Sequence, residues 1–228
     1  MVDPITRASV PDLVFASLCD AILSGRYEPG ERLPTQRTLA ADLNVNMASV
    51  REALKRLEQL RLVEVRHGDA TRVLDWRHSG GLEALAVLGG IDGTTVAALF
   101  EARRLLLAEA ARLAASRRTD EQAEQLMTLA EAMAKAKDDD AALLVDWSYM
   151  STVVEAAGNL VFQLIMNSVR ELYLPNVTAF APVVAGRDEL IAHYRRAADA
   201  IEERNATEAA ETIAELAGAQ ERQMLVSR

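Results

Sequence analysis

The sequence contains a single cysteine, Cys19, among its 228 residues. One cysteine cannot form a disulfide framework or a thiolate metal cluster, which fits a protein of a reducing compartment. The sequence also lacks any apolar run that approaches the ~20 residues needed to span a bilayer. Residues 1–14 contain two acidic residues and no apolar core typical of a signal peptide. These absences predict a cytoplasmic protein that does not act at a membrane.

Catalytic signatures are scarce as well. The sequence contains no G-x-S-x-G, no phosphate-binding loop, no H-E-x-x-H and no cysteine–histidine pairing, and its three histidines leave few catalytic candidates. Residues 138–140 are three consecutive aspartates, a run more typical of a loop or helix cap than of a metal site. We therefore expect a protein that is not an enzyme and that carries no cofactor.

Charge is distributed unevenly along the chain. Residues 1–77 hold 11 Lys and Arg and 11 Asp and Glu, whereas residues 78–228 hold 14 and 23, so the second part carries the whole net charge of −9. A field this negative repels nucleic acid. Any contact with DNA must therefore come from a local basic surface in the N-terminal part.

The N-terminal third has the patterns of three helices. Residues 11–25 show the apolar spacing of an amphipathic helix. A second helix is expected to begin after Thr35, which can serve as its N-cap. The third occupies part of residues 44–61, with its start near Ala48 or Ser49.

A hairpin is expected to follow these helices. Residues 62–76 alternate apolar and polar side chains around the turn "HGD", which is typical of two antiparallel strands. Three helices with a tight turn between the last two, followed by a hairpin, predict a winged helix-turn-helix domain over residues 1–76. In such a domain the third helix can project its N-terminal end into a DNA groove.

Strand signals nearly vanish after this region. Segments rich in Ala and Leu predict about seven helices, the first of them over residues 80–88. We place a linker at residues 77–81 and an all-α domain at residues 82–228. The expected fold class is therefore mainly α, with an N-terminal winged helix-turn-helix followed by an all-α bundle.

The leading end of the third predicted helix has the residue types of major-groove readout. Arg51 can bond guanine, and its small or polar neighbours can meet base edges, phosphates or a thymine methyl group. These neighbours are Asn46, Met47, Ala48 and Ser49. We expect the outer face of this helix to carry Ser49, Arg51, Lys55 and Arg56. Taken singly, such arginines can equally be solvated surface charges.

Two further features fit DNA binding. Arg37 lies early on the second predicted helix, where it can reach the phosphate backbone. His67 and Gly68 lie at the hairpin tip, where glycine permits close approach to a minor groove. Alone, Arg37 can be a surface charge and His67 a turn residue. In this order and together, the features favour a DNA-binding repressor or activator.

The stretch "PGERLPTQRTLAADLNVNMASVREALKRLEQLRLVEVRHG" resembles the winged-helix domain of the GntR family, whose pattern is PG..LP..R.LA..L.V....VREAL..L...GLV. The sequence departs from this pattern at Arg61, where glycine is usual. Fatty-acid-responsive members carry Arg where this chain has Met47, so we expect a different operator. The resemblance implies a homodimer on a pseudo-palindromic double-stranded DNA operator, with DNA contacts from Arg37, Asn46, Met47, Ala48, Ser49, Arg51, His67 and Gly68.

The wing and the all-α remainder resemble the FadR branch of this family. Many C-terminal domains of that branch bind a divalent metal through one Asp and three His, the first two spaced D-x-x-x-H. Asp146 is present here, but Met150, Tyr194 and Leu216 stand at the histidine positions. A thioether is a poor ligand at an imidazole site. His193 is either a slipped ligand or, more commonly for a lone histidine, a surface or core residue. We predict no metal.

Acyl-CoA-responsive FadR proteins also lack the metal, and residues 146–173 resemble their central helices, although the last helix lacks their ligand positions. We expect the all-α domain to mediate dimerisation and to bind an effector in an apolar pocket with a few polar anchors. Arg103 has Leu107 where its usual Glu partner would be, so we expect it to be free to clamp a carboxylate or phosphate. The candidate effector-binding residues, which can equally fill the core, are Arg103, Tyr149, Met150, Asn159, Asn167, Arg170, Tyr173 and Tyr194.

The resemblance thus implies a regulator that responds to a fatty acid, an acyl-CoA-like lipid or another apolar carboxylate. The alternative is a regulator that senses a small metabolic organic acid, with or without a divalent metal.

Overall fold

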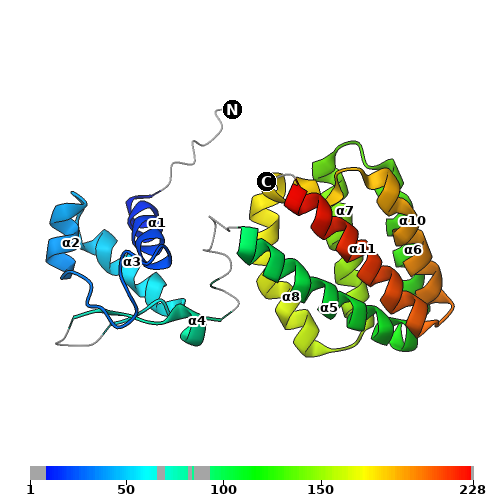
Figure 1. The fold of residues 1–228 in the computed structure, drawn as a ribbon, viewed down its shortest axis with the longest axis horizontal. Coiled ribbons are helices and arrows are strands. Elements are labelled where there is room, and N and C mark those ends of the chain that lie inside the picture. The colour runs from blue at the N-terminus through cyan, green and yellow to red at the C-terminus, as the bar shows by residue number, and fades with distance from the viewer. Residues whose placement is uncertain (1–8, 66–69, 82–83, 85–92, 227–228) are drawn as a thin grey trace. The chain divides into compact units, whose positions relative to one another are not determined.

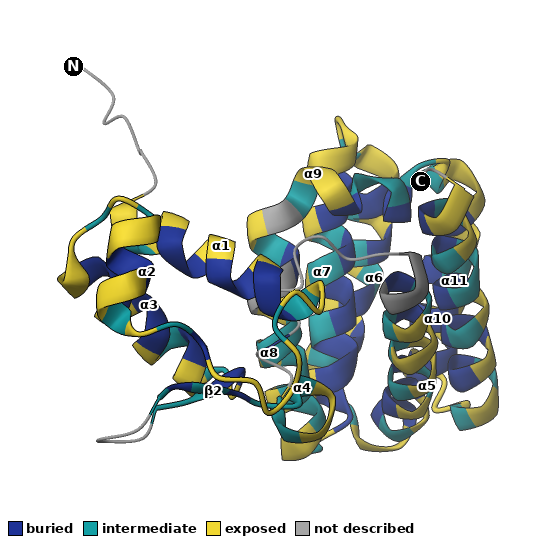
Figure 2. Ribbon diagram, turned by 60° about the vertical axis from the view of Figure 1, so that its left-hand side comes forward, coloured by how far each residue is buried: buried dark blue, intermediate teal, exposed yellow. Residues whose placement is uncertain are grey.

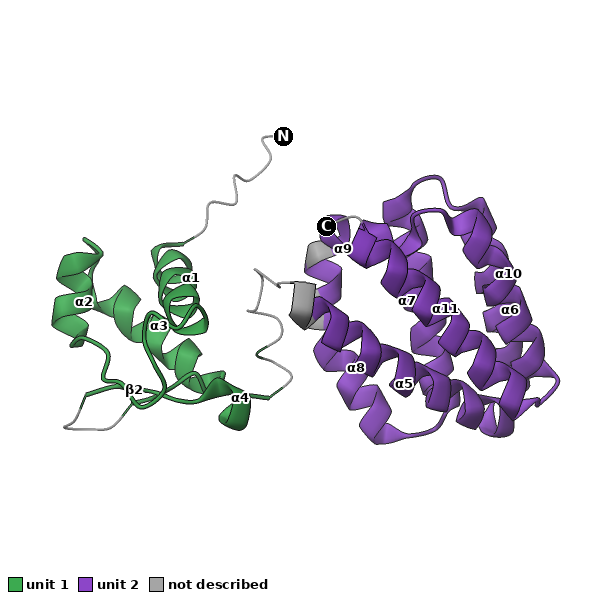
Figure 3. Ribbon diagram, in the orientation of Figure 1, with its two compact units in different colours: residues 1–89 green, residues 90–228 purple. Residues whose placement is uncertain are grey.

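The computed structural model describes residues 9–65, 70–81, 84 and 93–226 (Figure 1). The chain divides into two compact units, Met1–Gly89 and Gly90–Arg228 (Figure 3). The division falls later in the chain than the linker predicted at residues 77–81. That linker region instead contains the end of a short helix, α4 (Trp76–Ser79).

Three helices open the first unit: α1 (Val10–Leu23), α2 (Gln36–Asp42) and α3 (Met47–Gln59). The N-cap of α2 is Thr35, as predicted, because its hydroxyl accepts a backbone N–H from the first turn. The start of α3 lies at Met47, one residue before Ala48, near which it was predicted, and Asn46 serves as its N-cap. A short turn joins α2 to α3, so the predicted helix-turn-helix is confirmed.

The predicted hairpin is present and antiparallel, formed by β1 (Val63–Glu64) and β2 (Arg72–Val73). Arg32, from the segment between α1 and α2, adds an isolated bridge to Arg72. The hairpin is therefore tied to the helices at its base. Its tip, residues 66–69, lies outside the described residues.

The first unit has an apolar core to which every helix of the helix-turn-helix and both strands contribute. Cys19 lies in this core, and its burial raises the pKa of the thiol to about 11, so the thiol is protonated at neutral pH. The main apolar members of the core are Val14, Leu18, Ile22, Leu39, Val50, Leu54, Leu57, Leu62 and Val73.

Arg61 ends α3 in the left-handed backbone region, with φ of 55°. Its N–H donates to the carbonyl of Glu58 at 2.9 Å, which closes the end of the helix. A side chain in this region costs about 1–2 kcal/mol because its Cβ crowds the following carbonyl, a cost that glycine avoids. This explains why glycine is usual at the position that Arg61 takes.

The second unit is all-α, as predicted. Its helices pack as a bundle in which α5 lies against α7 and α11, and α10 lies against α6 and α11. Buried positions line the inner faces of these helices (Figure 2). The elements are α5 (Gly93–Arg117), α6 (Asp120–Lys135), α7 (Asp139–Ala156), α8 (Leu160–Tyr173), the 3-10 turn η2 (Leu174–Asn176), α9 (Val177–Phe180), the 3-10 turn η3 (Ala181–Val184), α10 (Arg187–Glu202) and α11 (Ala206–Val226).

Two further sequence expectations concern the helices. The helix expected over residues 80–88 lies largely outside the described residues. A helix long and apolar enough to cross a membrane does not occur in the part of the chain that the structure describes.

Candidate functional site

The N-terminal end of α3 is fixed by its own cap. The Asn46 side-chain oxygen accepts hydrogen bonds from the Ser49 backbone N–H at 2.8 Å and from the Ser49 hydroxyl at 3.2 Å. Ser49 is 4% exposed, so the prediction that it lies on the outer face of this helix is wrong. Asn46 and Ser49 together hold the first turn of α3 in place.

Asn46 is itself exposed, and further residues of this first turn reach solvent beside it. Met47 is 44% exposed, and Ala48 and Arg51 are exposed as well. Arg37 is exposed near the start of α2. The helix-turn-helix therefore presents two arginines and a small apolar surface, which is the combination that base edges and phosphates require.

Arg56, also predicted on the outer face of α3, lies against α1 instead. Its guanidinium is 2.6 Å from a carboxylate oxygen of Asp12 and 4.1 Å from the centroid of the Phe15 ring. The Ser9 hydroxyl and then Arg56 hold the pKa of Asp12 below its usual value. Arg56 thus helps to dock α1 on α3. The solvent-facing surface of α3 therefore includes fewer of the predicted residues than the sequence indicated.

The other predicted DNA contacts, His67 and Gly68, lie outside the described residues. The strand that follows them carries Arg72, whose Nη1 donates to the carbonyl of Gly30 at 3.3 Å. This bond attaches the described part of the wing to the turn after α1.

A polar cluster lies at the centre of the second unit, around Asp146 on α7. One carboxylate oxygen accepts from the Tyr194 hydroxyl at 2.6 Å and from the Gln220 amide at 2.8 Å. The other accepts from the Tyr173 hydroxyl at 3.0 Å and from the Arg103 guanidinium at 3.4 Å. We call these five residues the Asp146 cluster. Asp146 is 1% exposed, and each of its two carboxylate oxygens accepts two hydrogen bonds from protein side chains.

Arg103 is not free, and the prediction that it lacks a partner is wrong. Besides its contact with Asp146, its Nη1 donates to the side-chain oxygen of Gln220 at 2.7 Å. Leu107, which stands where the usual acidic partner would be, is buried in the apolar core and offers no charge to Arg103. The buried carboxylate of α7 and the amide of α11 take the place of that partner.

Two tyrosines of the cluster act as hydrogen-bond donors. Burial and the Asp146 carboxylate raise the pKa of Tyr173 and of Tyr194 well above the usual value for a phenol. Both hydroxyls therefore stay protonated at physiological pH and donate hydrogen bonds to the Asp146 carboxylate.

Tyr149 and Met150, two further candidate effector contacts, are fully buried. The Tyr149 hydroxyl donates to the backbone carbonyl of Tyr194 at 2.9 Å, and the two rings meet edge to face. These side chains fill the interior in the described conformation, the alternative that the sequence left open.

The structure separates the remaining candidate effector residues from this centre. Asn159 is the N-cap of α8. Asn167 and Arg170 line a groove of about 500 Å³ between α6, α7 and α8. The groove is mainly polar, and its other lining residues include Trp147, Ser148, Ser151, Thr152, Glu155 and Gln163.

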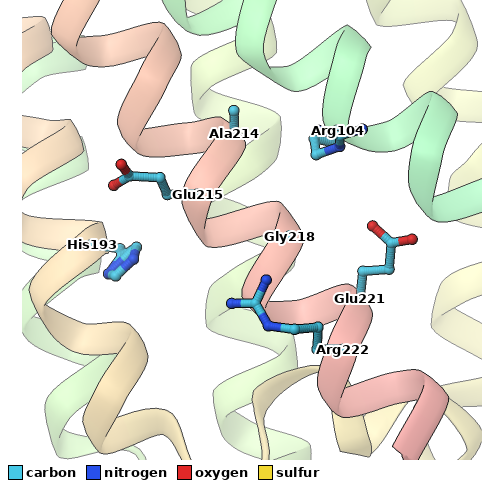
Figure 4. Close-up of a pocket in the computed structure, with 7 residues that line it drawn as sticks. All are labelled: Arg104, His193, Ala214, Glu215, Gly218, Glu221 and Arg222. Atoms are coloured by element: carbon cyan, nitrogen blue, oxygen red, sulfur yellow. The ribbon is translucent and has the colours of Figure 1, made fainter.

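His193 lies in a second surface pocket, of about 590 Å³, between α5, α10 and α11 (Figure 4). Burial lowers the pKa of His193; Glu215 opposes this shift and Arg196 adds to it. The pocket is also lined by Arg104, Ala214, Glu215, Gly218, Glu221 and Arg222, and its charged residues are of both signs.

The metal implied for other members of the branch does not fit these residues. At the three expected histidine positions, Met150 and Leu216 are buried apolar side chains, and the Tyr194 hydroxyl donates a hydrogen bond to Asp146. Within residues 9–65, 70–81, 84 and 93–226, no group of three or more His, Cys, Asp or Glu could hold a metal ion.

Gln220 is the cluster member that the sequence analysis did not assign to the site. Its signal is a polar residue at helical spacing within the apolar face of α11, four residues after Leu216 and four before Met224. A buried amide requires partners, so this position pointed to a second polar group inside the bundle.

Comparison with known proteins places these features in context. A family model described as "Bacterial regulatory proteins, gntR family" matches residues 12–73, and a model of the FCD domain matches residues 98–219. The chain is 37% identical over 232 residues to the "HTH-type transcriptional regulator Mce2R" of Mycobacterium tuberculosis, a match that covers 99% of this chain and 97% of the relative.

More distant relatives extend the comparison. The "Fatty acid metabolism regulator protein" of Yersinia pestis is 29% identical over 161 residues, which is 68% of this chain and 66% of the relative. The solved structure of Streptococcus agalactiae GntR is similar with a TM-score of 0.50 and 25% identity, covering 93% of this chain and 99% of that one.

Proposed function

Because this chain belongs to the GntR family of bacterial regulatory proteins and has an FCD domain, we propose that it is a ligand-responsive transcriptional regulator that binds a pseudo-palindromic operator as a homodimer. Such a regulator acts where the bacterial chromosome lies, in the cytoplasm. The two winged helix-turn-helix domains of the dimer, which we call its heads, are related by two-fold symmetry and read two half-sites one helical turn, or a multiple of it, apart.

The observation that carries this proposal is the exposed first turn of α3. The exposed Asn46 and the buried Ser49 bond to each other and fix the turn, and Met47, Ala48 and Arg51 remain available to a partner. An α-helix fits the major groove, where arginine can bond guanine at two atoms and a small apolar side chain can touch a thymine methyl group.

The proposal includes further contacts, which the resemblance to the GntR family implies. Arg37, at the start of α2, meets the phosphate backbone. His67 and Gly68 enter the adjacent minor groove from the wing. In this proposal the residues that touch DNA are Arg37, Met47, Ala48, Arg51, His67 and Gly68, while Asn46 and Ser49 position the helix that reads it.

We further propose that the effector is a fatty acid, an acyl-CoA-like lipid or another apolar carboxylate. The Yersinia relative named for fatty acid metabolism supports this class. The groove between α6, α7 and α8 offers Arg170 and Asn167 to a carboxylate or phosphate. The neighbouring surface of α8 leaves Leu160 and Leu164 more than half exposed, which suits an acyl chain.

Coupling then requires the effector to change how the two heads of the dimer are held. The spacing of the two recognition helices must match the half-sites to less than a helical turn, so a small change in the helical unit alters operator affinity.

In vitro selection from random duplexes, with the full-length protein, tests the DNA half of the proposal. We expect enrichment of an inverted repeat, bound with a two-to-one ratio of chains to duplex. Recovery of unrelated sequences without a repeat would contradict it.

The effector half is tested on the selected operator by titrating long-chain fatty acids, their CoA thioesters and small dicarboxylates. Arg170→Ala should lose the response to the active compound and keep operator affinity. The control is Arg112→Ala, which removes an exposed arginine of α5 that does not line the groove and should keep both the response and the affinity. A response to small dicarboxylates alone would favour the organic-acid alternative.

A further inference from the structure

The Asp146 cluster joins five separate helices of the second unit through one carboxylate. Tyr194, Gln220, Tyr173 and Arg103 come from α10, α11, α8 and α5, and Asp146 from α7. In many proteins a buried divalent metal ion links several helices in this way. Here the linking atoms all belong to side chains.

The number of donors matches the capacity of the carboxylate. A carboxylate offers about four lone-pair sites, and Asp146 receives four donors, two phenol hydroxyls, one amide and one guanidinium, at 2.6–3.4 Å. A metal ion binds through those same lone pairs. Its entry would require the donors to leave and would place a cation beside the Arg103 guanidinium.

Gln220 closes the network. Its side-chain oxygen accepts from Arg103 at 2.7 Å, and its amide donates to Asp146 and also lies 2.9 Å from the Tyr194 hydroxyl. The charge of Asp146 is balanced by Arg103, whose side chain is 17% exposed. The polar groups of the cluster are therefore paired and electrically neutral as a set.

The surrounding positions complete the exclusion of a metal. Met150 lies one turn after Asp146 on α7, Leu216 lies one turn before Gln220 on α11, and both are buried. They present a thioether and a hydrocarbon where an imidazole would have to stand. Hard and borderline divalent ions do not gain a ligand from either group.

We infer that this chain has replaced the divalent cation of related FCD domains by the Arg103 guanidinium and the protons of Tyr173, Tyr194 and Gln220. The five helices are thereby linked without a metal. The response of the regulator to its effector is consequently insensitive to chelators, and the effector is held by protein groups rather than by a bound ion.

A pair of single-hydroxyl deletions tests the structural part. Tyr194→Phe removes a donor to Asp146, whereas Tyr149→Phe removes an equally buried hydroxyl that bonds only a backbone carbonyl. We expect Tyr194→Phe to raise the unfolding equilibrium constant of the helical unit at least about tenfold more than Tyr149→Phe does. Equal effects of the two variants would contradict the role of Tyr194 in the cluster.

Cobalt absorption spectroscopy on chelator-treated full-length protein tests the metal part. Wild type should show no saturable visible bands with Co²⁺, and its melting temperature should not change with EDTA or with excess Zn²⁺. The triple variant Met150→His, Tyr194→His, Leu216→His should gain one equivalent of Co²⁺. If the triple variant does not fold, the double variant Met150→His, Tyr194→His serves, because with Asp146 it supplies three ligands.

One equivalent of Co²⁺ on the wild type, lost in Asp146→Asn, would overturn the inference, as would histidine variants that fold but gain no cobalt band. These measurements need no operator and no effector, so their failure is distinguishable from a failure of the proposed function.

Discussion

In the first unit the interior is apolar and the arginines Arg37 and Arg51 remain on the surface, whereas in the second unit an arginine and an aspartate, Arg103 and Asp146, lie inside. The charges of the first unit that face solvent are available to a partner. Those of the second unit are already bonded to each other and to neighbouring side chains. The same residue type therefore serves recognition in one unit and architecture in the other.

This difference has an energetic counterpart. Removing a solvent-exposed charge changes folding stability little. Removing one member of a buried pair leaves the other charge without compensation in a poorly solvated place, which costs about 3–5 kcal/mol. Substitutions can therefore separate the two roles.

The largest expected effect is on the stability of the second unit. Asp146→Ala should destabilise it by about 3–5 kcal/mol, because Arg103 loses its counter-charge and three donors lose their acceptor. Each unit contains one of the two tryptophans, Trp76 and Trp147, so fluorescence during denaturant unfolding in a Trp76→Phe background reports on the second unit alone.

Arg51→Ala is the matched control for that measurement, followed through Trp76 in a Trp147→Phe background. We expect its stability to stay within about 0.5 kcal/mol of the parent. A similar loss in the two variants would mean that the contrast between the units is not one of surface against interior.

A smaller effect is expected on DNA affinity. Arg37→Ala should weaken binding about 5- to 30-fold, equivalent to about 1–2 kcal/mol, and to a similar extent on all sequences, because a phosphate contact carries no base information. The slope of log K against log salt should fall by about 1. Fluorescence anisotropy across a salt series measures both, and Arg112→Ala should change neither.

Both units contain an arginine in the left-handed region at the end of a helix, Arg61 after α3 and Arg204 after α10. Arg61→Gly should stabilise the first unit by about 1 kcal/mol through relief of backbone strain. Arg204→Gly should gain less, since it also loses the bond from Arg204 to the carbonyl of Ser116. Thermal melts of the two variants make the comparison, and a destabilised Arg61→Gly would contradict it.

The smallest expected effect is the response of the first unit to acid. The pKa of Asp12 lies below its usual value in the folded state because the Ser9 hydroxyl and Arg56 favour the carboxylate. Its contribution to stability is therefore present above the unfolded pKa and is lost as the pH falls through the folded pKa.

Melting of the wild type and of Asp12→Asn should accordingly differ at pH 6 and converge at strongly acidic pH. A difference that persists unchanged into acid would show that Asp12 contributes through its shape rather than its charge.

The sequence predicted the fold well because the patterns involved are local. Thr35 as a helix cap, the alternation around the hairpin and the spacing of Leu54 and Leu57 depend on neighbours along the chain. The start of α3 was predicted near Ala48 or Ser49 and lies at Met47, within one residue of Ala48, but its cap, Asn46, was not identified from the sequence.

The interior of the second unit was predicted less well because its contacts join distant residues. Arg103 was expected to be free, yet its partners lie 43 and 117 positions away, at Asp146 and Gln220. Arg56 was expected on the outer face for the same reason, as its partner Asp12 belongs to another helix. Periodicity gives the face of a helix, but not the side chain that meets it.

The most direct test of the central claim is the ratio of affinities for the selected operator and for a scrambled duplex of equal length, measured for the wild type and for Arg51→Ala at one fixed salt concentration. The account predicts a wild-type ratio of at least about 10³. It also predicts that Arg51→Ala reduces the free-energy difference between the two duplexes by about 1–3 kcal/mol, because operator binding weakens while binding to the scrambled duplex changes little. Equal wild-type affinity for the two duplexes, or a ratio that Arg51→Ala leaves intact, would contradict the assignment of α3 as the helix that reads DNA.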